Sequence, residues 1–516
     1  MDMIGNRTLG GHLEERADLY GDRDLWVFES AGGEIECFTY RQVDRRVNQL
    51  ANGLLAAGIE VDSKVVVHLP NCSPFLLTWF ALAKIGAVMV PTNTANTAAE
   101  MRYQLAFSDA VAIVTSSSFL GIIRQATADL PSPPRIYLID GDGSAPDTRL
   151  WAGLWRGQSE RFAAVKLSPE HPAQILFTSG TTADPKGVVL THANCLFSGE
   201  QAAKLMRVAP GERCLSALPC FHCNAQTFVV LTPLAVGAAG VLIETFSASR
   251  FWTQVRSHRA NLISLLSAML RTVIAQPRST EERDHAVRIV NYGINCTDQE
   301  KADFEERFGV ALLNGYGLTE AMTIVASAPL DGRHNWPSVG LPAIGREVRI
   351  VDALGREVPA GTIGQIVCKG TPGRTLFKEY YKNPEATAAT LVDGWLQTGD
   401  AGYMDEAGYL YFFERMKDVV KRGGENVSTG EVERALLEHP AVLECAVVGI
   451  PDPIKDEAIL AYVVLRPDQR PTPEALISHC AQRLAKFKVP QFIKVCSSLP
   501  KTAIGKIQKK ALKKEI

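Results

Sequence analysis

The feature that most constrains this chain is a loop of small hydroxyl residues and glycines that carries a lysine near its end. It runs from Thr178 to Gly187 and reads Thr-Ser-Gly-Thr-Thr-Ala-Asp-Pro-Lys-Gly. Such a loop offers backbone N–H groups and side-chain hydroxyls to an anion, and its lysine adds a positive charge. The pattern indicates phosphate binding. The candidate ligands are Thr178, Ser179, Gly180, Thr181, Thr182 and Lys186.

The loop differs from a Walker-type phosphate loop at both ends. A Walker loop has glycine before its lysine, Ser or Thr after it, and a helix following. Here Pro185 and Gly187 flank Lys186, and apolar β-type runs lie at 175–177 and 188–190. We therefore expect a strand–loop–strand setting. The alternative is an ordinary surface turn, because Thr, Asp, Pro and Gly are common in turns.

Composition narrows the class of protein. A chain of 516 residues is long enough for two or more domains, and a net charge of −2 disfavours a nucleic-acid-binding protein. The eleven cysteines form no framework, which indicates reduced thiols in a cytoplasmic enzyme. No signal peptide is evident, and the apolar stretches 75–90 and 228–243 are interrupted or too short for a membrane span.

The order of expected elements indicates an α/β fold. Residues 39–57 have the apolar spacing of a helix, and short β-type runs alternate with helical segments as far as about residue 292. This rhythm predicts largely parallel sheets with helices on their faces. From about residue 348 the pattern changes to short strands separated by turns, which suggests a small antiparallel or barrel-like unit.

After Arg415 the chain restarts as a compact α+β pattern. Ser428 and Glu431 have the spacing of a helix capping box, and strands are expected at 442–450 and 460–465. We place a domain boundary here. The expected domains are a large N-terminal one, residues 1–416, and a small C-terminal one, residues 417–516.

Further motifs follow the loop, and together they resemble the signatures of the adenylate-forming superfamily, which includes acyl-CoA synthetases, peptide-synthetase adenylation domains and luciferases. Five motifs in the family's order span most of the chain. Beyond these motifs, the whole chain resembles the bacterial carnitine/crotonobetaine-CoA ligase group, for example at 271–277. The motifs are the loop itself, Asn314 to Glu320, Gly394 to Asp400, Arg415 to Asp418 with Gly423 to Val427, and Pro500 to Lys506.

The resemblance implies roles in binding ATP and Mg²⁺. Glu320 would hold Mg²⁺, Thr319 would contact the α-phosphate, and Tyr316 would stack on adenine. Asp400 would accept hydrogen bonds from the ribose, with Arg415 near it. A carboxylate in a glycine-containing turn suits Mg²⁺ that also binds phosphate oxygens. Asn314, Gly315 and Gly317 complete the nucleotide-binding motif.

The resemblance also implies a mobile C-terminal domain and coenzyme A as thiol acceptor. Lys506 would act in the first half-reaction, because a flexible ammonium group reaches the charge that develops near the α-phosphate. Lys417 matches a hinge, and rotation about it would exchange Lys506 for a thiol tunnel. Gly423 and Gly424 would line that tunnel, since glycine allows close approach.

The expected substrate is a small-molecule carboxylic acid, whose pocket is the least defined part of the site. By resemblance its walls come from 221–222, 265–269 and 292–295. His222 is either a satisfied buried histidine or a catalytic gate near the carboxylate. The closest resemblance suggests a small polar acid such as carnitine or crotonobetaine, and a hydrophobic or bulky acid stays open.

Four functions remain for comparison. The first is an ATP-dependent acyl-CoA ligase, which forms acyl-AMP, releases pyrophosphate and then makes a CoA thioester. The second is an adenylating enzyme that loads a carrier protein. The third is a luciferase-like oxidative enzyme, and the fourth a non-catalytic binding protein. The retained Lys186, Glu320, Asp400 and Lys506 argue against the fourth. Homodimer formation is left open.

Overall fold

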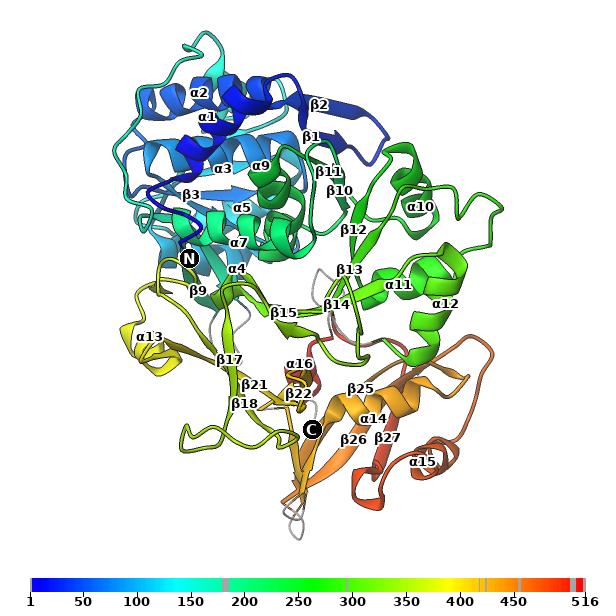
Figure 1. Cartoon of the computed structure of the whole chain (residues 1–516). Coiled ribbons are helices and arrows are strands. Elements are labelled where there is room, and N and C mark those ends of the chain that lie inside the picture. Colours follow the sequence, from blue (N-terminus) through cyan, green and yellow to red (C-terminus); the bar gives the residue numbers. More distant parts are fainter. Residues whose placement is uncertain are drawn as a thin grey trace.

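Two large sheets make up most of the N-terminal part of the protein (Figure 1). The computed structural model describes residues 2–178, 185–293, 296–416, 418–422, 425–452, 456–501 and 507–513. Within them the predicted α/β class is confirmed, with a large N-terminal part built on parallel sheets and a smaller C-terminal unit.

The first large sheet includes β8 and β9, the two strands that flank the predicted phosphate loop. Its eight strands run in the order β19-β9-β8-β4-β3-β5-β6-β7. Strands β8, β4, β3, β5, β6 and β7 are parallel, whereas β9 and β19 run against their neighbours. Their bounds are β3 Lys64–His68, β4 Val88–Pro91, β5 Ala110–Thr115, β6 Arg135–Leu138, β7 Thr148–Leu150, β8 Pro172–Thr178, β9 Lys186–Thr191 and β19 Glu379–Tyr380.

Both faces of this sheet are covered. Alternate residues of a strand point to opposite faces, and accordingly Val65 and Val67 join one hydrophobic cluster while Val66 joins another. The second cluster includes Met101 and Ile123 from the two helices α4 and α5. A strand buried on both faces reads as a continuous apolar run, which explains the sequence of β3.

The second large sheet has nine strands in the order β16-β15-β14-β13-β12-β10-β11-β1-β2. Its central strands are parallel, and β2, β15 and β16 are antiparallel additions at the edges. The bounds are β1 Asp24–Glu29, β2 Ile35–Thr39, β10 Arg213–Ser216, β11 Ala239–Ile243, β12 Leu262–Leu266, β13 Ile289–Gly293, β14 Leu312–Leu318, β15 Thr323–Ser327 and β16 Leu341–Pro342.

The helices of this part begin and end at recognisable signals. Thr39 caps α2 in a complete capping box with Gln42, and Gly86 ends α3 in the left-handed conformation. The helices are α1 Leu9–Tyr20, α2 Tyr40–Ala56, α3 Ser73–Ile85, α4 Ala98–Ser108, α5 Leu120–Thr127, α6 Ala152–Trp155, α7 His192–Leu205, α8 Cys223–Ala225, α9 Thr232–Val236, α10 Ala248–Ser257, α11 Ser267–Ile274 and α12 Asp298–Phe308, with short 3₁₀ turns at Ser117–Phe119 and Thr319–Ala321 and a π-helical turn at Gln226–Leu231.

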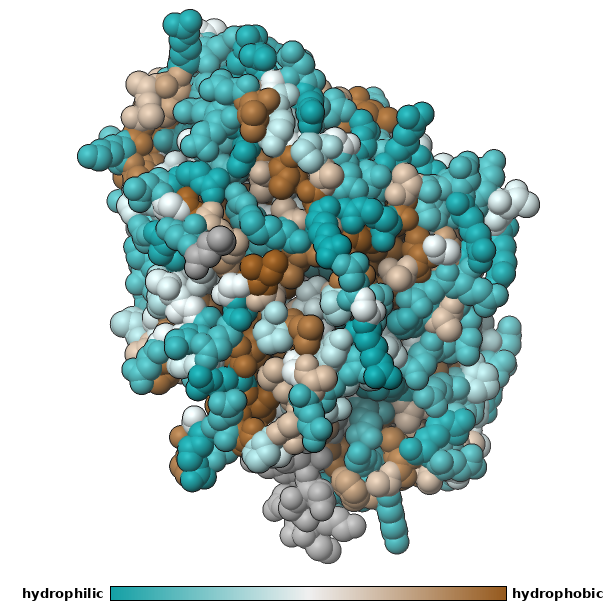
Figure 2. Space-filling model, in the orientation of Figure 1, coloured by the Kyte–Doolittle hydropathy of each residue, from teal (hydrophilic) through white to brown (hydrophobic). Residues whose placement is uncertain are grey.

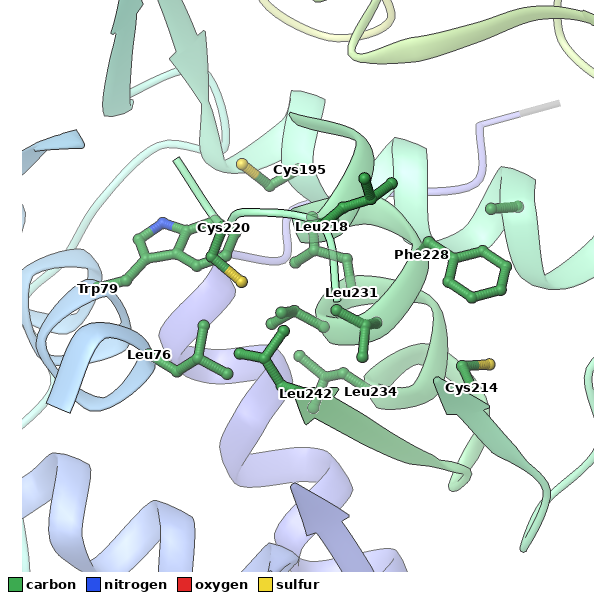
Figure 3. Packing of buried hydrophobic residues seen from close by; sticks show 14 of the residues in the cluster. Leu76, Trp79, Cys195, Cys214, Leu218, Cys220, Phe228, Leu231, Leu234 and Leu242 are labelled. Carbon is green, nitrogen blue, oxygen red and sulfur yellow. The ribbon is translucent and has the colours of Figure 1, made fainter. Parts of the chain in front are cut away.

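The main core lies where helices from both large sheets meet. Figure 3 shows Leu76 and Trp79 of α3 beside Leu231, Leu234 and other side chains from the second sheet's layer. Strand residues of both sheets belong to the same cluster. This shared core fixes the two sheets relative to each other, so that loops from both can contribute to one site.

The smaller units follow the predicted change of pattern. An antiparallel sheet of five strands comes first, and a second five-stranded sheet with packed helices forms the C-terminal unit, orange to red in Figure 1. The bounds are β17 Glu347–Val351, β18 Gly364–Lys369, α13 Pro384–Thr390, β20 Leu391–Val392, β21 Trp395–Met404 and β22 Leu410–Arg415, then β23 Val420–Arg422, β24 Glu425–Val427, α14 Thr429–Leu437, β25 Val442–Asp452, β26 Asp456–Leu465, α15 Pro473–Ala481, a 3₁₀ turn Lys486–Lys488, β27 Phe492–Cys496 and α16 Lys509–Lys513.

One local prediction is only half right. Ser428 caps α14 by accepting a hydrogen bond from the backbone N–H of Glu431, as the spacing indicated. The Glu431 carboxylate, however, binds the ammonium group of Lys488 at 2.7 Å. A partner from a distant segment has therefore replaced the second half of the capping box.

The surface is mostly polar. Hydrophilic side chains cover much of the face shown in Figure 2, with hydrophobic residues scattered among them. In the described part of the chain, no helix is both long enough and apolar enough to cross a membrane.

Candidate active site

The predicted phosphate loop connects two antiparallel strands, as expected. β8 ends at Thr178 and β9 begins at Lys186, and these two residues face each other across the ladder. The carbonyl of Pro185 accepts a hydrogen bond of 3.1 Å from the hydroxyl of Tyr103 on α4, which anchors the end of the loop. The predicted ligands Ser179, Gly180, Thr181 and Thr182 lie outside the described residues.

Lys186 is brought close to Glu320 through a tyrosine that sequence reasoning missed. The Nζ atom of Lys186 lies 4.7 Å from the ring centre of Tyr380, and the Tyr380 hydroxyl donates a hydrogen bond of 2.7 Å to Oε1 of Glu320. Burial, followed by the charge of Glu320, raises the pKa of Tyr380 well above its usual range. Nothing in the motif pattern marks Tyr380, although two adjacent tyrosines shortly before Asn383-Pro384, where helix α13 begins, are a weak signal.

Glu320 sits in a short 3₁₀ turn that follows β14. Its backbone carbonyl accepts a hydrogen bond of 2.8 Å from the N–H of Phe377, so the turn is held by the segment that leads into β19. The hydroxyl of its neighbour Thr319 lies 3.7 Å from the sulfur of Cys223. Thr319 therefore faces the loop that carries His222.

This arrangement fits Mg²⁺ bound together with phosphate. The described residues contain no group of three or more His, Cys, Asp or Glu side chains that could hold a metal alone. Mg²⁺ typically takes one or two carboxylates and completes its shell with phosphate oxygens and water. One carboxylate at Glu320, near a lysine at the phosphate loop, is a donor set of that kind.

Tyr316, Asp400 and Arg415 form a second group. The Tyr316 hydroxyl donates a hydrogen bond of 2.6 Å to Oδ2 of Asp400, and Nε of Arg415 lies 3.5 Å from Oδ1 of the same carboxylate. Asp400 and Arg415 are directly opposed on β21 and β22. Burial, and then the Asp400 charge, raises the pKa of Tyr316. The structure thus brings together residues from three separate motifs of the sequence.

The neighbouring motif residues shape the backbone. A Cβ added to Gly317 would come within 1.9 Å of the carbonyl oxygen of Thr323, so only glycine fits between β14 and β15. The Asn314 side chain donates a hydrogen bond of 3.2 Å to the carbonyl of Ser338, and Gly315 pairs with Ser327. Asn314 therefore fixes β14 to the loop before β16.

His222 is half-buried rather than enclosed, and its ring lies 4.6 Å from the ring of Phe221. Close to this loop, a chain of hydrogen-bonded polar side chains joins helix α8 to the middle of the parallel strands β12 and β13. Ser264 donates a hydrogen bond of 3.3 Å to Asn224 and accepts one of 3.5 Å from Asn291. These polar residues were not singled out from the sequence. Residues 294–295 of the predicted pocket wall lie outside the described part.

The junction with the C-terminal unit carries a partly buried cluster of charges. The Glu414 carboxylate accepts hydrogen bonds from the Thr429 hydroxyl and from the Gly430 N–H at 2.9 Å. Lys509 binds Glu433 at 2.9 Å and lies 4.0 Å from Glu414. The predicted Lys417, Gly423, Gly424 and Lys506 lie outside the described residues.

Comparison with known proteins decides the family. A model of the AMP-binding enzyme family matches residues 13–381, and a model of the AMP-binding enzyme C-terminal domain matches residues 431–506. The chain belongs to the AMP-binding enzyme family. The predicted resemblance to adenylate-forming enzymes is thereby confirmed.

The relatives of this AMP-binding enzyme align along its whole length. A crotonobetaine/carnitine–CoA ligase of Citrobacter koseri is 42% identical over 99% of this chain and 100% of its own, and one of Escherichia coli is 41% identical over the same shares. Among solved structures, an anthranilate CoA ligase with bound anthranoyl-AMP has a TM-score of 0.89 at 26% identity, over 99% of this chain and 97% of that one. A benzoate CoA ligase from Burkholderia xenovorans has a TM-score of 0.88 at 26% identity, over 98% and 100%.

Proposed function

We propose that this enzyme activates a small polar carboxylic acid as acyl-AMP and transfers the acyl group to coenzyme A. The predicted acyl-CoA ligase function is confirmed by the family match and by full-length relatives that are CoA ligases, and with it ATP, Mg²⁺ and coenzyme A. The carrier-protein alternative is not favoured. The identity of the acid and the role of each residue are our proposals.

The first half-reaction joins the acid to the nucleotide. A carboxylate oxygen forms a bond to the α-phosphorus of ATP, the bond from that phosphorus to the bridging oxygen breaks, and pyrophosphate leaves. We assign Lys186 to the departing phosphates and Thr319 to the α-phosphate. Mg²⁺ at Glu320 would supply the charge that offsets the phosphate oxygens. Lys506 would stabilise the charge that develops between carboxylate and α-phosphate.

The second half-reaction releases AMP. The sulfur of coenzyme A forms a bond to the acyl carbon, the bond from that carbon to the AMP oxygen breaks, and the thiol proton passes to solvent. We keep the boundary at 416/417 and the hinge at Lys417 as proposals, with Gly423 and Gly424 beside the incoming thiol. Rotation of the small unit would disengage Lys506 before the thiol enters.

The proposed nucleotide site is supported above all by the contacts that Asp400 makes with Tyr316 and Arg415. The Asp400 carboxylate is held by two donors on separate strands, one of which is the aromatic hydroxyl expected beside adenine. A carboxylate held in place can accept hydrogen bonds from two ribose hydroxyls without reorganising. The resulting proposal is ribose at Asp400 and adenine against Tyr316.

The polar chain through Ser264 supports a polar acid. Asn224, Ser264 and Asn291 link amide and hydroxyl groups from helix α8 to the middle of β12 and β13, next to the His222 loop. Burying such groups against an alkyl chain would leave hydrogen bonds unmade, which costs free energy. We therefore take crotonobetaine and carnitine, named in the full-length relatives, as the first acids to test.

The experiment measures pyrophosphate release and thioester formation over a panel of acids. Crotonobetaine and carnitine are compared with a neutral analogue in which carbon replaces the quaternary nitrogen, and with benzoate and a long-chain fatty acid. We expect the small polar acids to give the highest kcat/KM, with thioester formed only when coenzyme A is present. A preference for the fatty acid or for benzoate would contradict the proposal, and the neutral analogue tests whether the positive charge is recognised.

Location and assembly are also proposals. All eleven cysteines are free thiols, which supports the reducing cytoplasm as the site of action. Cell fractionation tests the location. Light scattering of the purified protein tests whether it forms a homodimer.

A further inference from the structure

Tyr380 contacts two residues of opposite charge, Glu320 and Lys186, to which the proposed function assigns Mg²⁺ and phosphate respectively. Its hydroxyl donates to the Glu320 carboxylate at 2.7 Å, and its ring receives the Lys186 ammonium group at 4.7 Å from the centre. The residue is only 6% exposed. One buried residue thus stands between the proposed magnesium ligand and the proposed phosphate ligand.

The backbone around Tyr380 is held by the same elements that carry these two residues. Tyr380 pairs with Val188 on β9, the strand that begins at Lys186, and the N–H of Tyr381 donates to the carbonyl of Gly187 at 2.7 Å. On the other side, Phe377 packs against the Tyr380 ring at 4.8 Å and binds the backbone of Glu320. The tyrosine is therefore placed by strand pairing and packing, independently of any ligand.

The position of Tyr380 affects whether Lys186 and Glu320 can pair directly with each other. Among the described residues, Lys186 and Glu320 each contact Tyr380 and form no ion pair with each other. A direct Lys–Glu pair would neutralise both groups and would have to break before phosphate and Mg²⁺ could bind. A neutral phenol gives each group a weaker partner, since a cation–π contact contributes about 0.5–2 kcal/mol.

We propose that Tyr380 is a positioning residue that keeps Lys186 and Glu320 apart and oriented, so that Glu320 is available to Mg²⁺ and Lys186 to phosphate. This rests on the proposed function of the site. Its hydroxyl serves the carboxylate and its ring serves the lysine. The two halves can be separated, because phenylalanine keeps the ring and loses only the hydroxyl, whereas leucine loses both.

The test measures ATP binding by isothermal titration calorimetry, with a range of Mg²⁺ concentrations and with EDTA. In Tyr380→Phe we expect the Mg²⁺ concentration for half-maximal ATP binding to rise roughly tenfold, the size expected for losing a hydrogen bond to a charged group. Its ATP affinity in EDTA should stay within about twofold of wild type, because the ring still holds Lys186. In Tyr380→Leu both affinities should fall.

The matched control is Tyr381→Phe, since that neighbouring hydroxyl donates to Asp109 on the other side of the strand pair. It should match wild type in both titrations, and thermal melting should show all three variants folded. The proposal is overturned if Tyr380→Phe keeps the wild-type Mg²⁺ dependence, or if its ATP affinity falls equally with and without Mg²⁺. A wild-type protein whose ATP binding gains nothing from Mg²⁺ would instead overturn the proposed function itself.

Discussion

The hydroxyl of Tyr316 donates a hydrogen bond of 2.6 Å to the carboxylate of Asp400, although the two residues lie 84 positions apart in the chain. Tyr316 is on β14 of a large sheet, and Asp400 is on β21 of the small antiparallel sheet. The contact therefore joins two separate sheets at the proposed nucleotide site. Their relative placement should matter for ATP more than for the acid.

Replacement of Asp400 by asparagine should raise the KM for ATP by about tenfold or more, because a charge-assisted hydrogen bond is lost. Tyr316→Phe keeps the ring that we propose lies beside adenine and should have a smaller effect. Steady-state kinetics with saturating acid measures both variants. Equal effects of the two on the KM for ATP would contradict ribose binding at Asp400.

Glu320→Gln removes the proposed magnesium charge but keeps the size of the side chain. We expect the rate of ATP–pyrophosphate exchange to fall about a hundredfold, the scale found when one preorganised electrostatic group is lost from an active site. Exchange measured at rising Mg²⁺ concentrations checks it. Full recovery at high Mg²⁺ would show weaker metal binding alone, and a wild-type rate at every concentration would remove Glu320 from the site.

Lys506→Ala and Lys417→Pro should separate the two half-reactions. The first should abolish most acyl-AMP formation, because no other cation is assigned to the developing charge. The second should spare adenylation and impair thioester formation, because proline restricts rotation at the proposed hinge. Single-turnover assays with and without coenzyme A distinguish them. Loss of both steps to the same degree in Lys417→Pro would count against the hinge.

Gly317→Ala should destabilise the fold. The new Cβ would lie 1.9 Å from the carbonyl oxygen of Thr323, and relieving such an overlap typically costs about 1–3 kcal/mol. Gly121→Ala is the matched control, because its Cβ would meet nothing within 4 Å in helix α5. Thermal melting should show a lower Tm for the first variant and an unchanged or slightly higher Tm for the second.

Buried histidines should make the protein less stable in mild acid. Burial lowers the pKa of His192 to about 3, of His12 to about 3 and of His68 to about 4. In the unfolded chain these groups bind protons from about pH 6.5 downward, so unfolding takes up protons. The free energy of unfolding therefore decreases as the pH is lowered, by up to about 1.4 kcal/mol per pH unit for each histidine.

His192→Asn tests this dependence. An asparagine oxygen can replace Nδ1 as the acceptor for the N–H of Leu9, whose bond to His192 is 3.3 Å long. Between pH 7 and pH 5, the Tm of the variant should decrease by less than the Tm of wild type, as measured by calorimetry. An identical loss in both proteins would show that His192 takes no part.

Much of the site could be predicted because its chemistry is local in sequence. The phosphate loop, the turn around Glu320 and the strand around Asp400 are short runs of hydroxyl, glycine and charged residues, and such runs determine backbone shape and charge within a few residues. The alternation of strands and helices could also be predicted, because the spacing of apolar residues that indicates each element involves only neighbours in the chain. These features determined the family, the fold class and the nucleotide chemistry.

Contacts between segments that are distant in the sequence were decided only by the tertiary structure. Tyr380 lies between Lys186 and Glu320 because β19 pairs with β9 while Phe377 binds the turn at Glu320. The Glu431 carboxylate binds Lys488 instead of completing its predicted capping box. A side chain's partner depends on which strands pair and which surfaces pack, and that choice depends on the energy of the whole fold rather than on any short run of residues.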